Sequence, residues 1–171
     1  MNKWDYERAT KSAKVLNAVT PVLNQYFGGK IITTERHESK IEQLLDYNCA
    51  IDALVETNKS IFGIAHRVKY NNYTDFTIRV YNPDGLTEID HMRQSGIKPR
   101  YHVQTVCIDG KPTKIAIAKS MDLLYAIDIL GLAKTKTAFS GCKFAILDWN
   151  KLMKYDINVD IINVDYMNLE F

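Results

Sequence analysis

The sequence predicts an α+β protein in which helices flank a central, mostly antiparallel sheet. Near the N-terminus apolar residues recur at three- and four-residue steps, whereas from residue 49 onward they form short runs separated by turn signals. The chain has 171 residues, of which 46% are apolar and 25% are charged, as in an ordinary globular domain. We therefore expect residues 1–171 to form a single domain.

Helices are predicted first along the chain. Residues 5–27 carry the amphipathic pattern, and the pair Gly28-Gly29 ends it. A second, shorter helix is predicted near 36–46, with glutamates on its polar side. Further along, residues 121–132 predict a helix that is capped by Ser120.

The strands are predicted from short apolar runs bounded by turns. They cover residues 49–55, 61–70, 76–81, 101–108, 114–118 and 144–147. The first two predict a hairpin, and Asp109-Gly110 predicts a second hairpin turn. Residues 86–100 are polar and are expected to be irregular, while alternation within 155–171 predicts an edge strand.

Several classes of protein are disfavoured by the sequence. No apolar run approaches the length of a membrane span, and the N-terminal residues MNKWDYERATKSAK lack the apolar stretch of a secretion signal. The three cysteines have no metal-binding spacing and are interpreted as reduced thiols. The motifs of P-loop nucleotidases, Rossmann dehydrogenases, serine hydrolases and zinc proteases are absent. We expect a cytoplasmic protein with no membrane partner.

Charge is distributed unevenly along the chain. Residues 1–143 carry 20 basic and 15 acidic side chains, whereas residues 144–171 carry two basic and five acidic ones. A mildly basic body is compatible with a polyanionic partner such as nucleic acid, and equally with an ordinary solvated surface.

Asp52 is the one charged residue in the apolar run 49–55. Burying its carboxylate costs free energy unless a cation, a metal or hydrogen-bond donors face it. Arg67 and Lys69 are two residues apart on the next predicted strand, so they project from one face and come close to Asp52 in a hairpin. Such a group is either a structural ion-pair network or a site of phosphodiester hydrolysis, in which carboxylates bind a divalent cation and a lysine assists the attacking water.

The residues around this group resemble the core of the PD-(D/E)XK nuclease superfamily. The stretches from Asp46 to Val55 and from Gly63 to Lys69 are similar to its pattern of an acidic helix before a β-hairpin. In that pattern one strand bears a metal-binding Asp, and the next bears an acidic residue or Gln, any residue, then Lys. The resemblance spans about residues 35–80. It implies a restriction-endonuclease-like core over about 35–148, between the N-terminal helix and an acidic tail at 149–171.

The resemblance also implies roles for individual residues. Lys69 becomes the catalytic lysine, and the implied ligands of a Mg²⁺ ion are Asp46, Asp52, Glu38 and Glu42. Arg67 occupies the position two before Lys69, and arginine cannot ligate Mg²⁺. Either the carboxylate comes from elsewhere and Arg67 steadies the phosphate during catalysis, or metal binding is lost and the fold serves another purpose. Each acidic residue also has a plain explanation as a solvated or ion-paired group.

Other basic residues suit contact with a phosphate backbone. The predicted substrate-binding residues are Arg79, Arg93, Lys98 and Arg100. Tyrosines near the predicted site, such as Tyr70 and Tyr73, suit stacking on unpaired bases, although most tyrosines are expected to complete the core.

Three functions are open from the sequence alone. The first is a Mg²⁺-dependent DNA endonuclease of a phage or mobile element, with Asp52, Lys69 and Arg67 as catalytic residues. The second is a catalytically inactive nuclease-fold module that binds DNA or a protein partner. The third is a structural or assembly protein, such as a homodimer that pairs through the edge of its acidic tail.

Overall fold

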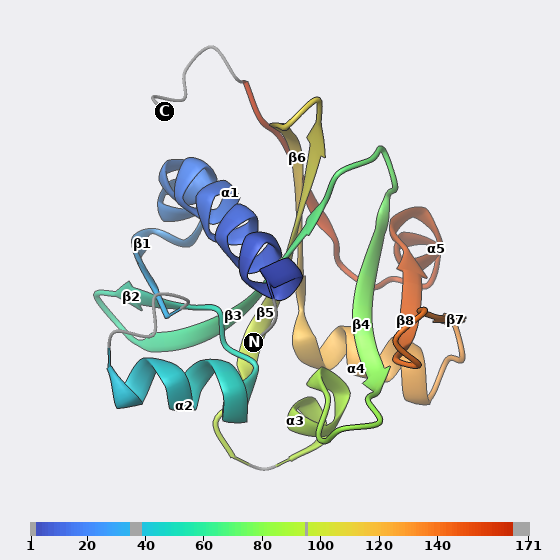
Figure 1. The fold of residues 1–171 in the computed structure, drawn as a ribbon. Coiled ribbons are helices and arrows are strands. Elements are labelled where there is room, and N and C mark those ends of the chain that lie inside the picture. Colours follow the sequence, from blue (N-terminus) through green and yellow to red (C-terminus); the bar gives the residue numbers. More distant parts are fainter. Residues whose placement is uncertain (1–2, 35–38, 95, 166–171) are drawn as a thin grey trace.

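The computed structural model describes residues 3–34, 39–94 and 96–165, without the side chains of residues 3–9, 47 and 48. These residues form a six-stranded mixed sheet and a three-stranded antiparallel sheet, with helices packed against both (Figure 1). The predicted α+β class, with a sheet flanked by helices, is confirmed. Within the same residues no helix is both long and apolar enough to cross a membrane.

The element bounds show where each part of the chain lies. The helices are α1 (Lys3–Phe27), α2 (Lys40–Cys49), α3 (Glu88–Arg93), α4 (Ser120–Asp128) and α5 (Trp149–Lys154). The larger sheet contains, in spatial order, β1 (Gly29–Thr33), β2 (Ala53–Thr57), β3 (Ile61–Lys69), β5 (Pro99–Ile108), β6 (Lys111–Lys119) and β9 (Asp160–Asn163). The smaller sheet contains β4 (Asp75–Tyr81), β8 (Lys143–Asp148) and β7 (Lys134–Thr137). The pairing of β3 with β5 is parallel, and the other pairings are antiparallel.

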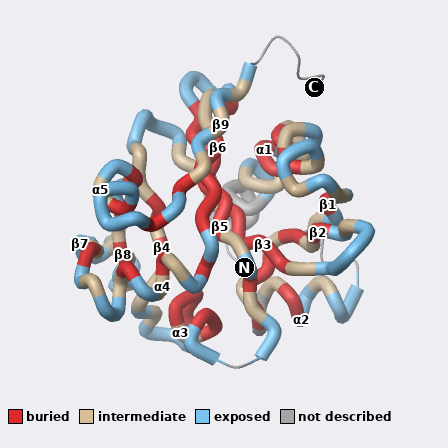
Figure 2. The backbone as a smooth tube through the Cα atoms, turned by 180° about the vertical axis from the view of Figure 1, so that it is seen from behind, coloured by how far each residue is buried: buried red, intermediate tan, exposed pale blue. Residues whose placement is uncertain are grey.

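The larger sheet buries apolar side chains on both faces. Along β6, Ile115 and Ile117 belong to the cluster under α1, whereas Ala116 and Ala118 belong to the cluster shared with the smaller sheet and α4. Figure 2 shows the buried residues concentrated along β5 and β6 at the centre of the molecule. The larger sheet is therefore the middle layer, with α1 on one side and the smaller sheet on the other.

Helix α1 follows the predicted amphipathic pattern. Leu16, Val19 and Leu23 recur at three- and four-residue steps and are fully buried against the larger sheet. Pro21 lies inside the helix on its exposed side. The prediction of a helix over 5–27 is confirmed.

The hairpin of β2 and β3 is also confirmed, but its first strand begins later than predicted. Helix α2 continues to Cys49, because Leu45 and Cys49, four residues apart, are both buried in one cluster with Ile51. Ala50 then ends the helix in the left-handed conformation (φ 53°). The strand prediction for 49–52 is therefore wrong.

Four elements were not predicted: β1, α3, β7 and α5. The predicted cap of α4 is also wrong, because Ser120 is the first helical residue and its side chain bonds His102 instead. The edge strand predicted within 155–171 is present as β9, which pairs with β6. Pairing of this edge with a second chain stays a prediction.

Candidate functional site

Asp52 lies between α2 and β2, where contacts with β3 fix its position. Its backbone N–H donates to the carbonyl of Ile64 (2.9 Å), and its carboxylate accepts from the backbone N–H of His66. Gly63 allows this close approach, because a Cβ there would lie 2.5 Å from the side chain of Ile51. Asp52 is thus placed by the hairpin on the side of the sheet that also carries Arg67.

The surroundings of Asp52 change its acidity. Burial raises the pKa of Asp52 to about 7, although attraction to Arg67 and the hydrogen bond from His66 oppose the rise. Asp46 and Glu88 are negatively charged neighbours that add to it. Near neutral pH this carboxyl therefore carries only part of a full charge.

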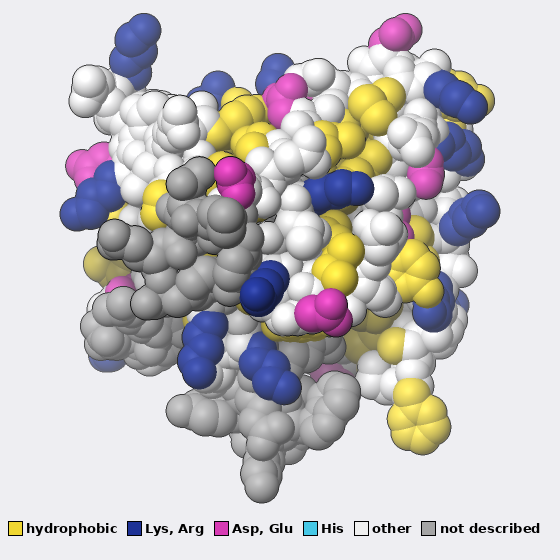
Figure 3. All heavy atoms as spheres, turned by 90° about the horizontal axis from the view of Figure 1, so that it is seen from above, with side chains coloured by type: hydrophobic (Ala, Val, Ile, Leu, Met, Phe, Trp, Pro, Cys, Tyr) yellow, Lys and Arg dark blue, Asp and Glu magenta, His cyan; other side chains and the backbone are white. Residues whose placement is uncertain are grey.

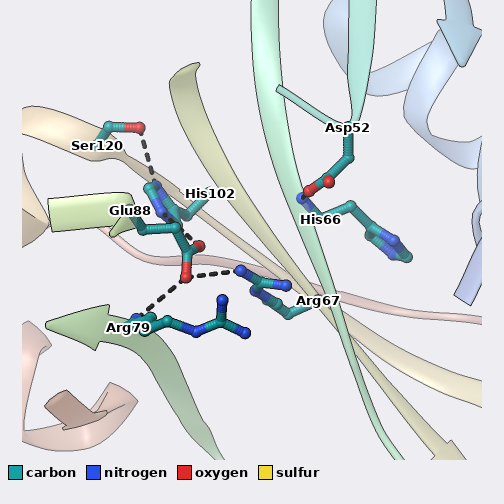
Figure 4. A network of polar contacts seen from close by, with 7 residues as sticks. All are labelled: Asp52, His66, Arg67, Arg79, Glu88, His102 and Ser120. Carbon is teal, nitrogen blue, oxygen red and sulfur yellow. Dashed lines mark hydrogen bonds and ion pairs between the residues drawn. The ribbon is translucent and has the colours of Figure 1, made fainter. Parts of the chain in front are cut away.

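Arg67 is anchored by Glu88, a residue of α3 that the sequence did not single out. The Nη2 of Arg67 lies 2.7 Å from Oε2 of Glu88, and the same oxygen accepts from the backbone N–H of Arg79 (3.0 Å) (Figure 4). The side chain of Glu88 is 4% exposed and that of Arg67 is 39% exposed. Burial alone would raise the pKa of Glu88, but Arg67 and contacts from His102 outweigh it and hold that pKa well below its usual range. Glu88 is therefore a buried anion that fixes the guanidinium of Arg67.

A histidine and a serine extend this network away from Arg67. The Nδ1 of His102 lies 2.9 Å from Oγ of Ser120, and its Nε2 lies 3.6 Å from Oε1 of Glu88 (Figure 4). Serine, histidine and carboxylate in line suggest a nucleophile, but Ser120 is only 1% exposed. That hydroxyl is buried, and neither Nε2 of His102 nor Oε1 of Glu88 has a hydrogen-bond partner among the described residues, so we interpret His102 as an electrostatic neighbour of Glu88.

Arg79 comes from β4, in the opposing smaller sheet. Its guanidinium carbon lies 5.7 Å from the centroid of the Phe144 ring, and its Nε is buried without an acceptor among the described residues. A buried donor without a partner costs about 1–3 kcal/mol. An anion with several acceptor oxygens would supply the missing partner of this nitrogen.

Three adjoining cavities, of about 300, 100 and 600 Å³, lie between the larger and the smaller sheet. The first and second share Arg67 and Arg79, while the second and third share Lys69 and Phe144. We name this run of cavities the inter-sheet groove. Its charged and aromatic lining is Asp46, Asp52, Arg67, Arg79, Glu88 and His91 in the first cavity, Arg67, Lys69, Arg79 and Phe144 in the second, and Lys69, Tyr70, Tyr73, Asp75, Lys136 and Phe144 in the third.

The groove contains several of the residues predicted from the sequence. Asp46, Asp52, Arg67 and Arg79 meet in the first cavity. Lys69 shares a face with Arg67, as predicted, but its ammonium pairs with Asp75. One predicted metal ligand, Glu42, lies apart from this group, because it accepts the backbone N–H of Ser39 at the start of α2. Glu38 lies outside the described residues.

The described residues do not complete the predicted Mg²⁺ site. Asp46 and Asp52 line one cavity, but Glu88, the third carboxylate there, is neutralised by Arg67. In the described ranges no three Asp, Glu, His or Cys side chains come together to hold a metal ion. The Mg²⁺ assignment therefore stays a prediction.

The other predicted phosphate-binding cations lie outside the inter-sheet groove, where each has a local partner. Arg93 makes a two-pronged ion pair with Asp128, with N–O distances of 2.6 and 3.1 Å. Lys98 donates to two backbone carbonyls at the end of α3 (3.0 and 2.9 Å), and Arg100 lies 5.2 Å from the centroid of Phe62. The structure does not bring these three residues to the groove.

Sequence reasoning missed Glu88 and His91 because it missed α3. One signal was available, since Thr87 and Asp90 have the spacing of a reciprocal helix cap. In the structure both the N–H and the hydroxyl of Thr87 donate to Asp90, at 2.8 and 2.7 Å. A helix predicted from this cap would have placed Glu88 in its first turn.

The surface and the comparisons with known proteins add no further assignment. On the described part of the face in Figure 3, lysine and arginine side chains are dispersed among acidic and hydrophobic ones. No family model matches the chain, and searches of curated proteins and of solved structures found no match. The resemblance to the PD-(D/E)XK nucleases therefore stays a prediction.

Proposed function

We propose that this protein is a binding module that takes nucleic acid into the inter-sheet groove, with a phosphate held between Arg67 and Arg79. One observation carries the proposal. These two arginines form the wall shared by the first two cavities, and the buried Nε of Arg79 has no acceptor among the described residues. A phosphate supplies the acceptor oxygens that this nitrogen lacks.

The anchoring of Arg67 supports this interpretation. Arginine binds phosphate best when its planar guanidinium is held in advance, because less side-chain entropy is then lost on binding. Glu88 holds Arg67 at 2.7 Å from the buried side, and the backbone N–H of Arg79 donates to the same carboxylate oxygen. The chain thus carries a fixed cation where the nuclease pattern has a carboxylate, as the inactive-module hypothesis requires.

A cytoplasmic location and a DNA partner belong to the same proposal. The three cysteines are free thiols, which suits a reducing compartment. Lys69, which is paired with Asp75, lies next to the two arginines along the groove, so a second phosphate of a backbone would compete with Asp75 for this lysine.

Fluorescence anisotropy with labelled oligonucleotides tests this function. Arg79→Gln should weaken binding of every sequence by about 10-fold, and it should lower the slope of log K against log salt by roughly 0.7 to 0.9. Arg100→Gln is the matched control, because it removes the same charge outside the groove and should leave affinity near that of the unmodified protein. Equal losses in the two variants would exclude the groove as the binding site.

Hydrolysis is a second candidate function, favoured by one specific observation. Asp46 and Asp52 line the same cavity as the two arginines, so carboxyl groups lie where a bound phosphate is expected. If the protein cleaves DNA with Mg²⁺ or Mn²⁺, Asp52→Ala and Lys69→Ala should each abolish cleavage while thermal unfolding stays cooperative. Calorimetric titration with either metal should then give heat that Asp52→Ala removes. Cleavage that survives in Asp52→Ala would exclude this candidate.

A further inference from the structure

The third cavity of the inter-sheet groove is aromatic as well as cationic. Tyr70 and Tyr73 follow the end of β3 and are 52% and 60% exposed. Phe144 forms the wall shared with the second cavity, and Lys136 of β7 also lines the third cavity. The Nζ of Lys69 lies 5.5 Å from the centroid of the Tyr73 ring. The cavity therefore combines exposed tyrosines with two lysines, of which Lys69 is paired with Asp75 and Lys136 is exposed.

This combination favours a flat ring attached to an anion. An aromatic face that is left in water gains free energy when another ring stacks on it, and a neighbouring cation attracts the phosphate of the same ligand. Asn71 also lines the cavity, and its amide can both donate and accept hydrogen bonds at a base edge. A nucleobase on a sugar-phosphate backbone has all of these complementary parts.

The order of the cavities along the groove favours a single-stranded ligand over a double-stranded one. The third cavity adjoins the second through Lys69 and Phe144, and the second shares Arg67 and Arg79 with the first. The arginines and the tyrosines therefore line neighbouring cavities, which successive nucleotides of one backbone would occupy in our proposal. In a duplex each base is stacked and paired, so its face is not available to a tyrosine. The third cavity, of about 600 Å³, is within the usual size range of ligand pockets.

We propose that the groove takes single-stranded nucleic acid, with an unpaired base stacked on Tyr73 beside the phosphate held by Arg67 and Arg79. This inference rests on the proposed function and specifies its substrate class. The stacking and phosphate contacts are common to DNA and RNA, so the test includes an oligo(dT) and an oligo(U) of about 12 nucleotides.

Substitutions at Tyr73 test the stacking directly. Tyr73→Leu keeps an apolar side chain but removes the ring, and it should weaken binding of both oligonucleotides by about 5- to 100-fold. Tyr73→Phe keeps the ring and should stay within about twofold of the unmodified protein. Tyr125→Leu is the matched control, because Tyr125 is a tyrosine of α4 with 48% exposure outside the groove. Thermal denaturation verifies that each variant is folded.

An abasic oligonucleotide of the same length separates this inference from the proposed function. It keeps the phosphates, so Arg79→Gln should weaken its binding whereas Tyr73→Leu should not. If Arg79→Gln weakens both ligands and Tyr73→Leu weakens neither, phosphate binding stands and the single-strand inference fails. If Arg79→Gln weakens neither, the proposed function itself fails. A blunt duplex that binds as tightly as oligo(dT) also overturns the single-strand inference.

Discussion

The structure divides the predicted site cations into two regions of the molecule. One group lines the inter-sheet groove, and the other lies on the surface around the connection from α3 to β5. The groove group is Arg67, Lys69 and Arg79, and the surface group is Arg93, Lys98 and Arg100. The residue types are the same in both regions, so the difference between them lies in what surrounds each cation.

Two ion pairs show this difference. In the pair of Arg93 with Asp128 the side chains are 50% and 31% exposed, so water solvates both charges. In the pair of Arg67 with Glu88 the acid is 4% exposed and the cation is 39% exposed on a cavity wall. A buried acid holds its cation with the other side of the cation facing the cavity, whereas in an exposed pair each charge is solvated by water and neutralised by its partner. A lysine or arginine is therefore a better candidate for binding when its partner is buried behind it.

Glu88→Gln should give the largest difference between the two ion pairs in folding stability. It leaves Arg67 partly buried without its counter-charge, so we expect a loss of about 2–3 kcal/mol in the free energy of unfolding, measured by urea denaturation. Asp128→Asn removes the same charge from the exposed pair and should cost less than about 1 kcal/mol. Equal losses in the two variants would show that burial of the acid does not distinguish the pairs.

Paired charge removals compare the two regions in binding. The double variant Lys69→Gln/Arg79→Gln should lose about 100-fold in affinity for single-stranded DNA, and its salt slope should fall by roughly 1.4. Arg93→Gln/Arg100→Gln lowers the net charge equally and should change affinity by less than about threefold, as measured by anisotropy. Similar losses would mean that total charge, and not the groove, attracts the ligand.

Short apolar runs bounded by turns, together with the two-residue period of a strand, made much of the larger sheet predictable from the sequence. The strands β3, β5 and β6 bury side chains on both faces, and the turn Asp109-Gly110 fixes the hairpin between the last two. The same two-residue period correctly placed Arg67 and Lys69 on one face. Local pattern determines such features, so they can be found without knowing how the elements pack.

Glu88, the acid that pairs with Arg67, was missed because its helix has a weak hydrophobic pattern and only the Thr87–Asp90 cap marks it in the sequence. Helix α3 buries Glu88 and His91 as well as apolar residues, which breaks the hydrophobic period that marks a helix. Its position is set by packing in the core shared with β4 and α4, far along the chain from Arg67. Likewise, β7 has the sequence KTKT, and all four of its residues are exposed.

Binding should weaken as the pH rises through the pKa of Asp52. Burial raises the pKa of Asp52 to about 7, so between pH 6 and pH 8 this carboxyl gains negative charge beside Arg67 and repels a phosphate. We expect a loss in affinity of roughly fivefold over this range at low salt, and Asp52→Asn should flatten the profile. Anisotropy at each pH measures it. A metal-dependent site would give the opposite sign, because metal ligation requires the deprotonated carboxylate.

The smallest effect that we predict is on folding stability. The pKa of Asp52 is higher in the folded chain, about 7, than its ordinary value of 3.8, so the folded state binds this proton more tightly. Proton binding at Asp52 therefore contributes fully to the free energy of unfolding below pH 3.8, and this contribution is lost as the pH rises through 7.

Two neighbouring groups make the free energy of unfolding depend on pH in the opposite direction. Burial lowers the pKa of His66 to about 3, so the stability that neutral His66 contributes is lost as the pH falls below 6.5. The pKa of Glu88 is also lowered, so the stability that its carboxylate contributes is lost as the pH falls below about 4.5. Both contributions are present in the unmodified protein and in Asp52→Asn, so they cancel in the difference between the two free energies of unfolding. That difference should fall by about 1 kcal/mol between pH 5 and pH 8 in urea denaturation, less than the full shift gives because Asp52 is partly exposed. Asp84→Asn, which removes a carboxyl from an exposed turn, is the control. If the difference in unfolding free energy for Asp52→Asn does not change between pH 5 and pH 8, the pKa of Asp52 does not lie in this range and the prediction fails.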